Sequence, residues 1–358
     1  MRIDRYPENP LITPADVPPS REDLEVVCVF NAGVATYGDE TILLMRVAER
    51  GKSDSSVARV PVIECPGGLC VREFERSDPR FSFADPRIIA TPEGIFLTTI
   101  SHLRIARSKD GRHFTVDPKP ALFPDRESES FGQEDPRITE IDGLYYIAYK
   151  SVSPLGICIS LAVTGDFRTF EKEGIIFGPE NMDVCIFPEK VGGRYVAVHR
   201  PVSGFSSSPN MWIAYGPDLL SWGDHRFLMG VNRRSWDSER VGGGAVPIKT
   251  DRGWLEIYHA ADFKGRYCLG AVLLDLHEPH KVIARGREPI FVPEALYETT
   301  GFVPNVVFTC GALVDGDKVS IYYGAADTVI AGVDMSLREI LKTLDLDLRL
   351  QPPVPGFP

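Results

Sequence analysis

Three features of the 358-residue sequence predict an all-β fold. Its 29 prolines and 32 glycines are many for a helical protein, and they indicate frequent turns between short strands. A turn with Gly or Asp followed by an alternating aromatic strand recurs along the chain. The copies are separated by 50 to 60 residues. Such a period, with about four strands per unit, is typical of a β-propeller.

The repeated unit can be followed from one copy to the next. Aromatic strands are predicted at residues 142–149, 193–200, 253–260 and 316–323, with a weaker copy at 94–100. A second strand follows each of them, at residues 104–114, 160–167, 212–219, 269–272 and 330–334. Each of these following strands carries an alanine, and together they give Ala106, Ala162, Ala214, Ala271 and Ala331. Successive alanines are 56, 52, 57 and 60 residues apart. Five units are therefore clear.

The two ends of the chain are less regular. A sixth, weaker unit can be drawn over residues 30–70, so the repeats alone leave five and six blades open. Only residues 335–348 have helical periodicity, with Leu337, Ile340, Leu341 and Leu344 on one face and Ser336 as the N-cap. No linker-like segment divides the chain, and we expect a single domain over residues 1–358.

Composition excludes several classes of protein. The net charge of −11 disfavours nucleic acid as a partner. No apolar run is long enough for a membrane span, and the N-terminus lacks the apolar core of a secretory signal. The seven cysteines include no CxxC pair and lack zinc-ligand spacing. We therefore expect buried free thiols, no metal site and a cytoplasmic location.

Polar residues at equivalent places in successive repeats are candidates for a site, because the innermost strands of a propeller converge at its axis. The tetrapeptide Asp-Pro-Arg-Ile occurs twice, beginning at Asp85 and at Asp135. Aspartate before proline favours an extended backbone that can hold the carboxylate at the start of a strand. The other residues in such places are Asn31, Glu134, Glu189 and the glycines at 242–244.

A second group of candidates is basic or aromatic. Cations within strands of an acidic protein need a partner, which can be a structural carboxylate or a bound anion. These cations are Arg46, Lys190, His199 and Arg200, with Lys150 as a weaker candidate. Aromatic strands end at Tyr258-His259 and at Tyr323, near Asp327, a combination that suits sugar binding as well as an ordinary core. The glycines at 242–244 precede no helix, so a dinucleotide site is not expected.

In these ordered motifs the chain resembles glycoside hydrolase family 130, the mannoside phosphorylases and related β-mannosidases. The matching segments lie at residues 31–34, 44–49, 83–87, 134–137, 187–190, 199–201, 240–244, 258–259 and 323–327. They extend over nearly the whole chain. In detail the chain is most similar to the β-1,2-mannobiose phosphorylases, partly through residues 182–184 and 223–226.

The resemblance implies a five-bladed propeller that converts a terminal β-mannoside and phosphate into α-mannose 1-phosphate with inversion. It makes Asp135 the general acid, acting through the mannose 3-hydroxyl, and assigns phosphate to Arg46, Lys190, His199 and Arg200. The residues it suggests for the sugar are Asn31, Asp85, Glu134, Arg137, Glu189, His259, Tyr323 and Asp327. Inorganic phosphate is then a co-substrate, no cofactor is implied, and homo-oligomer formation is left open.

Physical reasoning agrees with this reaction. An inverting hydrolase needs a second carboxylate that activates water. Phosphate is already an anion and needs cations that shield its charge from the catalytic aspartate. One acid beside a basic pocket therefore predicts a phosphorylase. The alternatives are a β-mannoside hydrolase of the same family and a carbohydrate-binding propeller without catalysis. Incubation with a mannoside, with and without phosphate, distinguishes all three.

Overall fold

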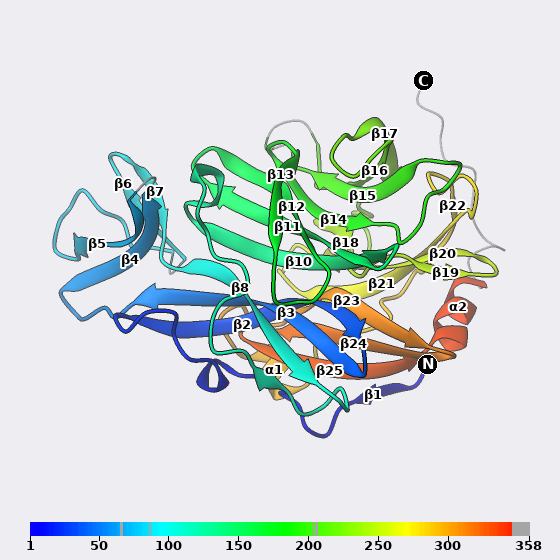
Figure 1. Cartoon of the computed structure of the whole chain (residues 1–358), viewed down its shortest axis with the longest axis horizontal. Helices are drawn as coiled ribbons and strands as arrows, with labels where there is room; N and C mark the ends of the chain where they lie inside the picture. The colour runs from blue at the N-terminus through cyan, green and yellow to red at the C-terminus, as the bar shows by residue number, and fades with distance from the viewer. Residues whose placement is uncertain (65–66, 86, 203, 205–206, 346–358) are drawn as a thin grey trace.

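The computed structural model describes residues 1–64, 67–85, 87–202, 204 and 207–345, and these residues form mainly β-strands (Figure 1). The strands fall into five antiparallel groups and two hairpins. The first group contains β2 (Leu24–Tyr37), β3 (Glu40–Gly51), β8 (Ile100–Ser108) and β9 (Thr115–Val116). The second contains β10 (Gly132–Ile141), β11 (Leu144–Ser153), β12 (Gly156–Thr164) and β13 (Glu171–Phe177). One parallel bridge between Gly132 and Ser101 joins these two groups into a single sheet.

The other three groups are separate sheets. The third contains β14 (Asn181–Ile186), β15 (Tyr195–Pro201), β16 (Met211–Gly216) and β17 (Gly223–Met229). The fourth contains β18 (Arg240–Gly243), β19 (Ile248–Thr250), β20 (Gly253–Ala261), β21 (Tyr267–Leu274) and β22 (Val282–Arg285). The fifth contains β23 (Val307–Asp315), β24 (Lys318–Ala325), β25 (Val329–Ser336) and β1 (Ile3–Arg5). The N-terminal strand thus completes the sheet that is built last along the chain.

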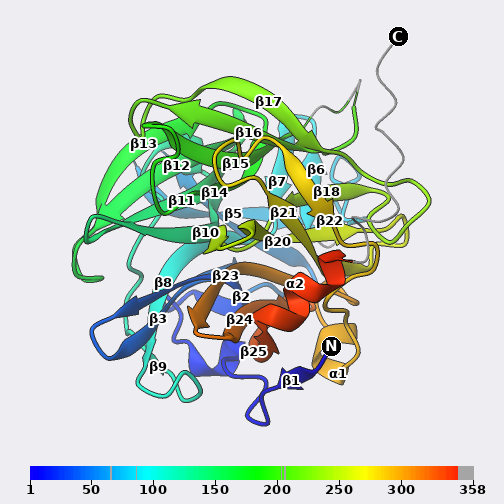
Figure 2. The same cartoon turned by 90° about the vertical axis from the view of Figure 1, so that its right-hand side faces the viewer.

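The first strands of the groups lie together in the middle of the molecule (Figure 2). β2 contacts β10 and β23, β10 contacts β14, and β14 contacts β18. The alanines that define the sequence repeat lie on β8, β12, β16, β21 and β25, and all five are fully buried. The predicted repeat is therefore confirmed as one strand group per copy.

The N-terminal part of the repeat prediction is wrong in one respect. Residues 94–100 do not supply the strand that pairs with β8 in the first group, because β3 takes that position. Residues 52–99 are inserted between β3 and β8. They form the β4–β7 extension, two hairpins made of β4 (Val57–Glu64) with β5 (Gly68–Glu75) and β6 (Ile88–Thr91) with β7 (Gly94–Leu97). Figure 1 shows this extension at one end of the molecule. The weak sixth unit is thus divided between the first group and the extension.

Helices are few and short in the described part of the chain. Two 3₁₀ turns span Pro14–Asp16 and Glu127–Glu129, and α1 spans Leu296–Thr299. The predicted C-terminal helix is α2 (Leu337–Asp345), and Ile340, Leu341 and Leu344 are buried on its inner face. Ser336 Oγ accepts a hydrogen bond from Glu339 N at 3.2 Å, as expected for the N-cap. Residues 346–348 of the predicted helix lie outside the described residues.

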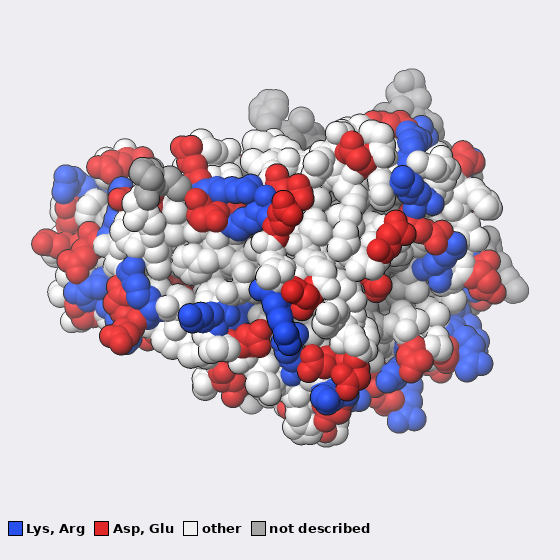
Figure 3. Space-filling model, in the orientation of Figure 1, with Lys and Arg blue, Asp and Glu red and all other residues white. Residues whose placement is uncertain are grey.

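Three features of the structure relate to the expectations drawn from composition: the surface charge, the helices and the cysteines. Acidic and basic side chains are interspersed on the face seen in Figure 3. The expectation that nucleic acid is not a partner stays a prediction. None of the described helices is long and apolar enough to cross a membrane. Six of the cysteines are free thiols, and Cys65 lies outside the described residues.

Candidate active site

Asp135 is the centre of a buried polar cluster where the first strands meet. Its carboxylate accepts hydrogen bonds from Asn31 Nδ2 at 2.9 Å, from Arg46 Nη1 at 3.2 Å and from Lys150 Nζ. Arg46 also binds Glu134, and its guanidinium lies 4.5 Å from the centre of the Phe30 ring. Burial by itself would raise the pKa of Asp135, but the charges of Lys150 and Arg46 outweigh it and hold that pKa well below its usual range.

The local backbone explains why the carboxylate points inward. Asn31, Asp135 and Asp183 have φ angles of 48°, 47° and 56°, and each lies where strand pairing is interrupted by a register shift. Asn and Asp tolerate this left-handed conformation better than other residues with a side chain. A β-bulge changes the direction in which the side chains of the bulged strand point. Three strand groups therefore present an amide or carboxylate at the same place.

Asp183 forms a second ion-paired centre beside the first. Its carboxylate contacts Arg200 Nη1 at 2.7 Å, Arg137 Nη2 at 3.2 Å and His259 Nε2 at 3.1 Å. Lys150 Nζ lies 3.9 Å from Asp183, so this lysine connects the two carboxylates. Burial lowers the pKa of His259 to about 4, and the imidazole is therefore neutral at pH 7.

Arg137 has a structural place in this cluster. Its side chain is 1% exposed, and it donates hydrogen bonds to the carbonyl oxygens of Asp135 at 3.0 Å and Gly243 at 2.8 Å. The guanidinium thereby ties β10 to β18 beneath the two aspartates. In the described structure Arg137 therefore holds the two strands in place, and its expected contact with the sugar stays a prediction.

Asp327 differs from the other carboxylates. It has a φ of 49° and is half-buried, and no ion pair or hydrogen bond of its carboxylate occurs among the described residues. Burial raises the pKa of Asp327 to about 6, although Arg46 and Lys150 act against the shift. The negative charges of Asp135 and Glu134 contribute to the same rise, which places Asp327 beside them.

Four residues expected at the site lie elsewhere. Glu189 and Lys190 are exposed beyond the far end of β14, six and seven residues after Asp183. β14 ends at Ile186, so both residues lie in the loop that follows the strand. Glu189 pairs with Lys249, and Lys190 Nζ lies 4.5 Å from the centre of the Tyr195 ring. The assignment of phosphate to Lys190 and of sugar to Glu189 is therefore not supported by their positions.

His199 and Tyr323 have other packing partners. His199 lies next to Arg200 on β15, so its side chain points to the opposite face, where it stacks on Phe177. Burial lowers the pKa of His199 to about 3, which removes the charge expected to hold phosphate. Tyr323 is fully buried and donates its hydroxyl to Glu298 Oε1 at 2.6 Å. Neither side chain joins the cluster.

Asp85 lies outside the cluster but on the same side of the molecule. In the β4–β7 extension its carboxylate pairs with Arg87, at 2.7 Å between Oδ2 and Nη2. The hydrogen bond with the Asp85 carboxylate raises the pKa of Arg87, and the negative charge of Asp327 adds to the rise. Asp85 lines a neighbouring cavity instead of contacting Asp135.

Two cluster members were underestimated from the sequence. Lys150 was only a weak candidate, although it contacts both central carboxylates. Asp183 was noted in a family-like motif but not as a site residue. A signal for Asp183 was present, since it follows Asp135 by 48 residues, close to the repeat length, and lies in the first strand of the next unit.

Comparisons with known proteins identify the family and agree with the fold. The family model Glyco_hydro_130, described as β-1,4-mannooligosaccharide phosphorylase, matches residues 96–346. A β-1,2-mannobiose phosphorylase from Listeria innocua is 48% identical over 98% of this chain and 100% of its own length. The solved structure of a Listeria innocua β-1,2-mannobiose phosphorylase in complex with β-1,2-mannobiose covers 97% of this chain and 100% of its own, with a TM-score of 0.93.

More distant relatives carry related names. A β-1,2-mannobiose phosphorylase from Thermoanaerobacter sp. is 34% identical over 95% of this chain and 99% of its own length. A 1,2-β-oligomannan phosphorylase from the same source is 44% identical over 67% of this chain and 80% of its own. By the extent of these matches, the chain belongs to glycoside hydrolase family 130, the family of the mannoside phosphorylases.

Proposed function

We propose that this protein is a glycosyltransferase that carries out inverting phosphorolysis of β-1,2-mannobiose or short β-1,2-mannosides. The products are α-mannose 1-phosphate and mannose or a shortened oligosaccharide. The observation that carries the proposal is the buried carboxylate of Asp135, which is held between the cations of Arg46 and Lys150. The β-1,2 linkage is favoured because relatives with that name are 48% and 34% identical over 98% and 95% of the chain. A β-1,4-named relative aligns over only 63% of the chain, and a 4-O-β-mannosyl-glucose phosphorylase is only 28% identical over 94%.

Asp135 is the proposed general acid, and it delivers its proton to the leaving oxygen through the mannose 3-hydroxyl. In the ligand-free protein its low pKa keeps it ionised. A phosphate anion that recruits Arg46 and Lys150 withdraws two cations from the aspartate. The pKa of Asp135 then rises toward that of a group able to carry a proton. Phosphate thus acts both as the nucleophile and as the switch that prepares the acid.

The proposed phosphate site differs from the one inferred from the sequence. Arg46, Lys150 and Arg200 replace the set that included Lys190 and His199, because these three side chains reach the two central aspartates. Arg200 offers a further donor, since its Nε is buried without a partner among the described residues. Asn31 and Asp327 are the proposed contacts of the mannose, with Glu134 and His259 beside them.

One observation favours hydrolysis as a second candidate. Asp327 is a carboxylate without an ion pair among the described residues, and its pKa of about 6 suits a base that activates water. Glu134 and Asp183 are each paired with arginine and suit that task less. The cations around Asp135 favour phosphate as the nucleophile, so hydrolysis remains the alternative.

The proposal extends to the architecture. Five strand groups, whose first strands lie together, support a five-bladed β-propeller that forms one catalytic domain over residues 1–358. Pairing of β1 with β25 supplies the closing strand of the fifth blade. A cytoplasmic location and the formation of homo-oligomers stay predictions.

The test is the product formed from β-1,2-mannobiose with and without phosphate. We expect equal amounts of α-mannose 1-phosphate and mannose, and no turnover in phosphate-free buffer. Two free mannoses at the same rate in both buffers would establish the hydrolase instead. Binding of mannobiose without either product would leave only a carbohydrate-binding role.

A further inference from the structure

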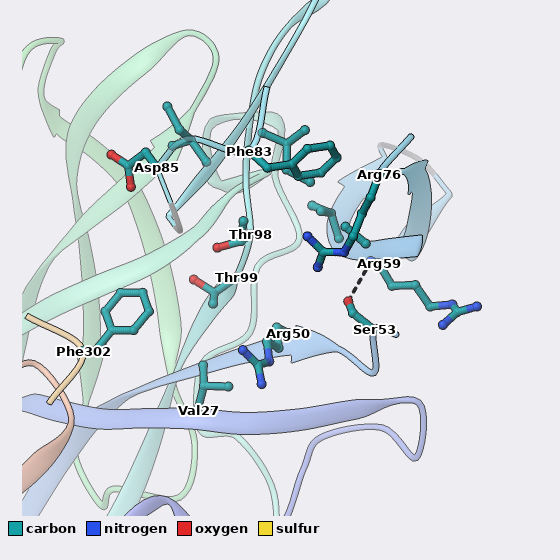
Figure 4. A pocket seen from close by; sticks show the side chains of 14 residues that line it. Val27, Arg50, Ser53, Arg59, Arg76, Phe83, Asp85, Thr98, Thr99 and Phe302 are labelled. Atoms are coloured by element: carbon teal, nitrogen blue, oxygen red, sulfur yellow. Dashed lines mark hydrogen bonds between the residues drawn. The ribbon is translucent and has the colours of Figure 1, made fainter. Parts of the chain in front are cut away.

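A cavity of about 300 Å³ lies between the β4–β7 extension and the first strand group (Figure 4). We call it the outer cavity. One wall comes from β2 and β3, through Val27 and Arg50, and the opposite wall comes from the extension. Phe302, which follows α1 in the chain, lies at its edge and is 43% exposed. Its volume is at the lower end of the range for small-molecule sites.

The lining suits a ligand with both hydroxyl groups and apolar faces. Phe83 and Phe302 supply aromatic surface, and Thr98 and Thr99 line the cavity with hydroxyl-bearing side chains. A pyranose ring presents C–H groups on its faces and hydroxyls at its edge. It can therefore contact the rings and the polar side chains at the same time.

The arginines of the outer cavity favour a neutral ligand over an anion. Arg50 pairs with Glu25, and Arg59 pairs with Asp54 and Glu73, so their charges are already balanced. Arg76 donates from Nε to the carbonyl of Asp54, and its guanidinium lies 5.3 Å from the centre of the Phe83 ring. Planar guanidinium groups of this kind can donate to sugar hydroxyls without a strong net positive field.

Three chain segments run from the outer cavity to the candidate active site. β2 carries both Val27 and Asn31, and β3 carries both Arg50 and Arg46. Four residues of strand correspond to about 13 Å, a distance that a short oligosaccharide can bridge. The backbone N–H of Phe302 donates to Thr328 Oγ1 at 2.7 Å, directly beside Asp327.

We propose that the outer cavity binds the acceptor-side sugars of a β-1,2-linked mannooligosaccharide, beyond the two residues that flank the cleaved bond. The proposal rests on the proposed function, in which the terminal mannose occupies the cluster around Asp135. The rest of the chain then leaves that cluster toward the extension, where Phe302 and Arg76 contact it. The substrate class is accordingly the β-1,2-mannotriose and longer oligomers, as well as mannobiose.

The test compares phosphorolysis of β-1,2-mannobiose, mannotriose and mannotetraose by Phe302→Ala and Arg76→Ala. An aromatic contact of about 0.5–1.5 kcal/mol corresponds to a change of roughly two- to twelvefold. For Phe302→Ala we expect such a loss of kcat/KM for triose or tetraose, with mannobiose changed by less than about twofold. Phe302→Tyr should restore it. The matched controls are Phe227→Ala and Arg80→Ala, whose exposed side chains lie outside the outer cavity.

The outcomes separate this proposal from the proposed function. Wild-type protein without phosphate-dependent turnover of any β-1,2-mannoside would refute the proposed function itself. Normal wild-type turnover, with equal effects of Phe302→Ala on all chain lengths or with no effect, would refute the outer cavity as a sugar site. A higher KM for phosphate in Arg76→Ala at every chain length would also refute it and would indicate an anion site.

Discussion

Single residues determine how charge is balanced around Asp135. Its carboxylate is buried, which disfavours the ionised form, yet three donors surround it and two of them are cations. A carboxylate paired with two cations stays ionised and is a poor proton donor until another anion binds those cations. Phosphate carries the charge needed to engage them, so binding of the nucleophile and readiness of the acid become linked.

This linkage predicts opposite effects of Asp135→Asn on turnover and on phosphate binding. Turnover should fall roughly 10²- to 10⁴-fold, as expected for loss of a general acid. Phosphate should bind at least as tightly as in wild type, because a neutral side chain no longer competes for Arg46 and Lys150. Steady-state kinetics and calorimetric titration with phosphate measure the two quantities.

Asp85→Asn is the matched control, since Asp85 begins the other Asp-Pro-Arg-Ile segment but lies outside the cluster. It should keep most of its activity on mannobiose. A folded Asp135→Asn protein with more than about a tenth of the wild-type kcat, or with clearly weaker phosphate binding, would contradict the assignment.

Residue types and motif positions predicted some members of the cluster correctly and assigned other residues to it that lie elsewhere. Asp135, Arg46 and Asn31 were found because each lies in the first strand pair of a repeat. Lys190 lies away from Asp183 because the motif 187–190 begins after the end of β14, where the side chain is exposed. His199 was misassigned because neighbouring residues of a strand face opposite ways, a distinction that proximity in a motif hides.

At the level of elements, β18 shows how backbone shape makes room for the cluster. It contributes glycine where the neighbouring groups contribute Asn31, Asp135 and Asp183. A Cβ atom at Gly242 would lie 2.7 Å from both Arg200 Nη1 and His259 Nε2. The bare strand therefore allows the ion pair between Asp183 and Arg200 to pack against it.

Gly242→Ala should displace Arg200 and weaken its pairing with Asp183. We expect a higher KM for phosphate, by about tenfold, and a loss of about 1–3 kcal/mol in the free energy of unfolding from overpacking. Gly223→Ala is the control, because no atom lies within 4 Å of the added methyl group there. An unchanged KM for phosphate in a stable Gly242→Ala protein would remove Arg200 from the proposed phosphate site.

The extension illustrates what a repeat pattern cannot reveal. Residues 94–100 match the aromatic strand pattern, but pairing partners are decided by the whole sheet. β3 is a longer and more apolar partner for β8 than β7, whose Gly94 and Ile95 are exposed. Local propensity is therefore overridden by tertiary packing in this segment.

For the molecule as a whole, the two ends of the described chain are joined in one sheet. Ile3, Asp4 and Arg5 pair with Met335, Asp334 and Val333. The next residue, Tyr6, is buried and packs edge-on against Tyr322 at 6.1 Å between ring centres. Its hydroxyl donates to Asp334 Oδ1 at 2.7 Å. Such a contact between the chain ends holds the last sheet to the first element.

Tyr6→Ala should therefore destabilise the whole fold and leave the chemistry intact. Removing a buried aromatic ring costs about 3–5 kcal/mol, here measured as the free energy of unfolding in denaturant. Asp4→Ala, an exposed change on the adjacent strand, should stay within about 0.5 kcal/mol of wild type. Below its unfolding transition, Tyr6→Ala should keep the wild-type KM for mannobiose and phosphate, because Tyr6 contacts no member of the Asp135 cluster. A Tyr6→Ala protein as stable as Asp4→Ala would show that the N-terminal segment does not close the fold.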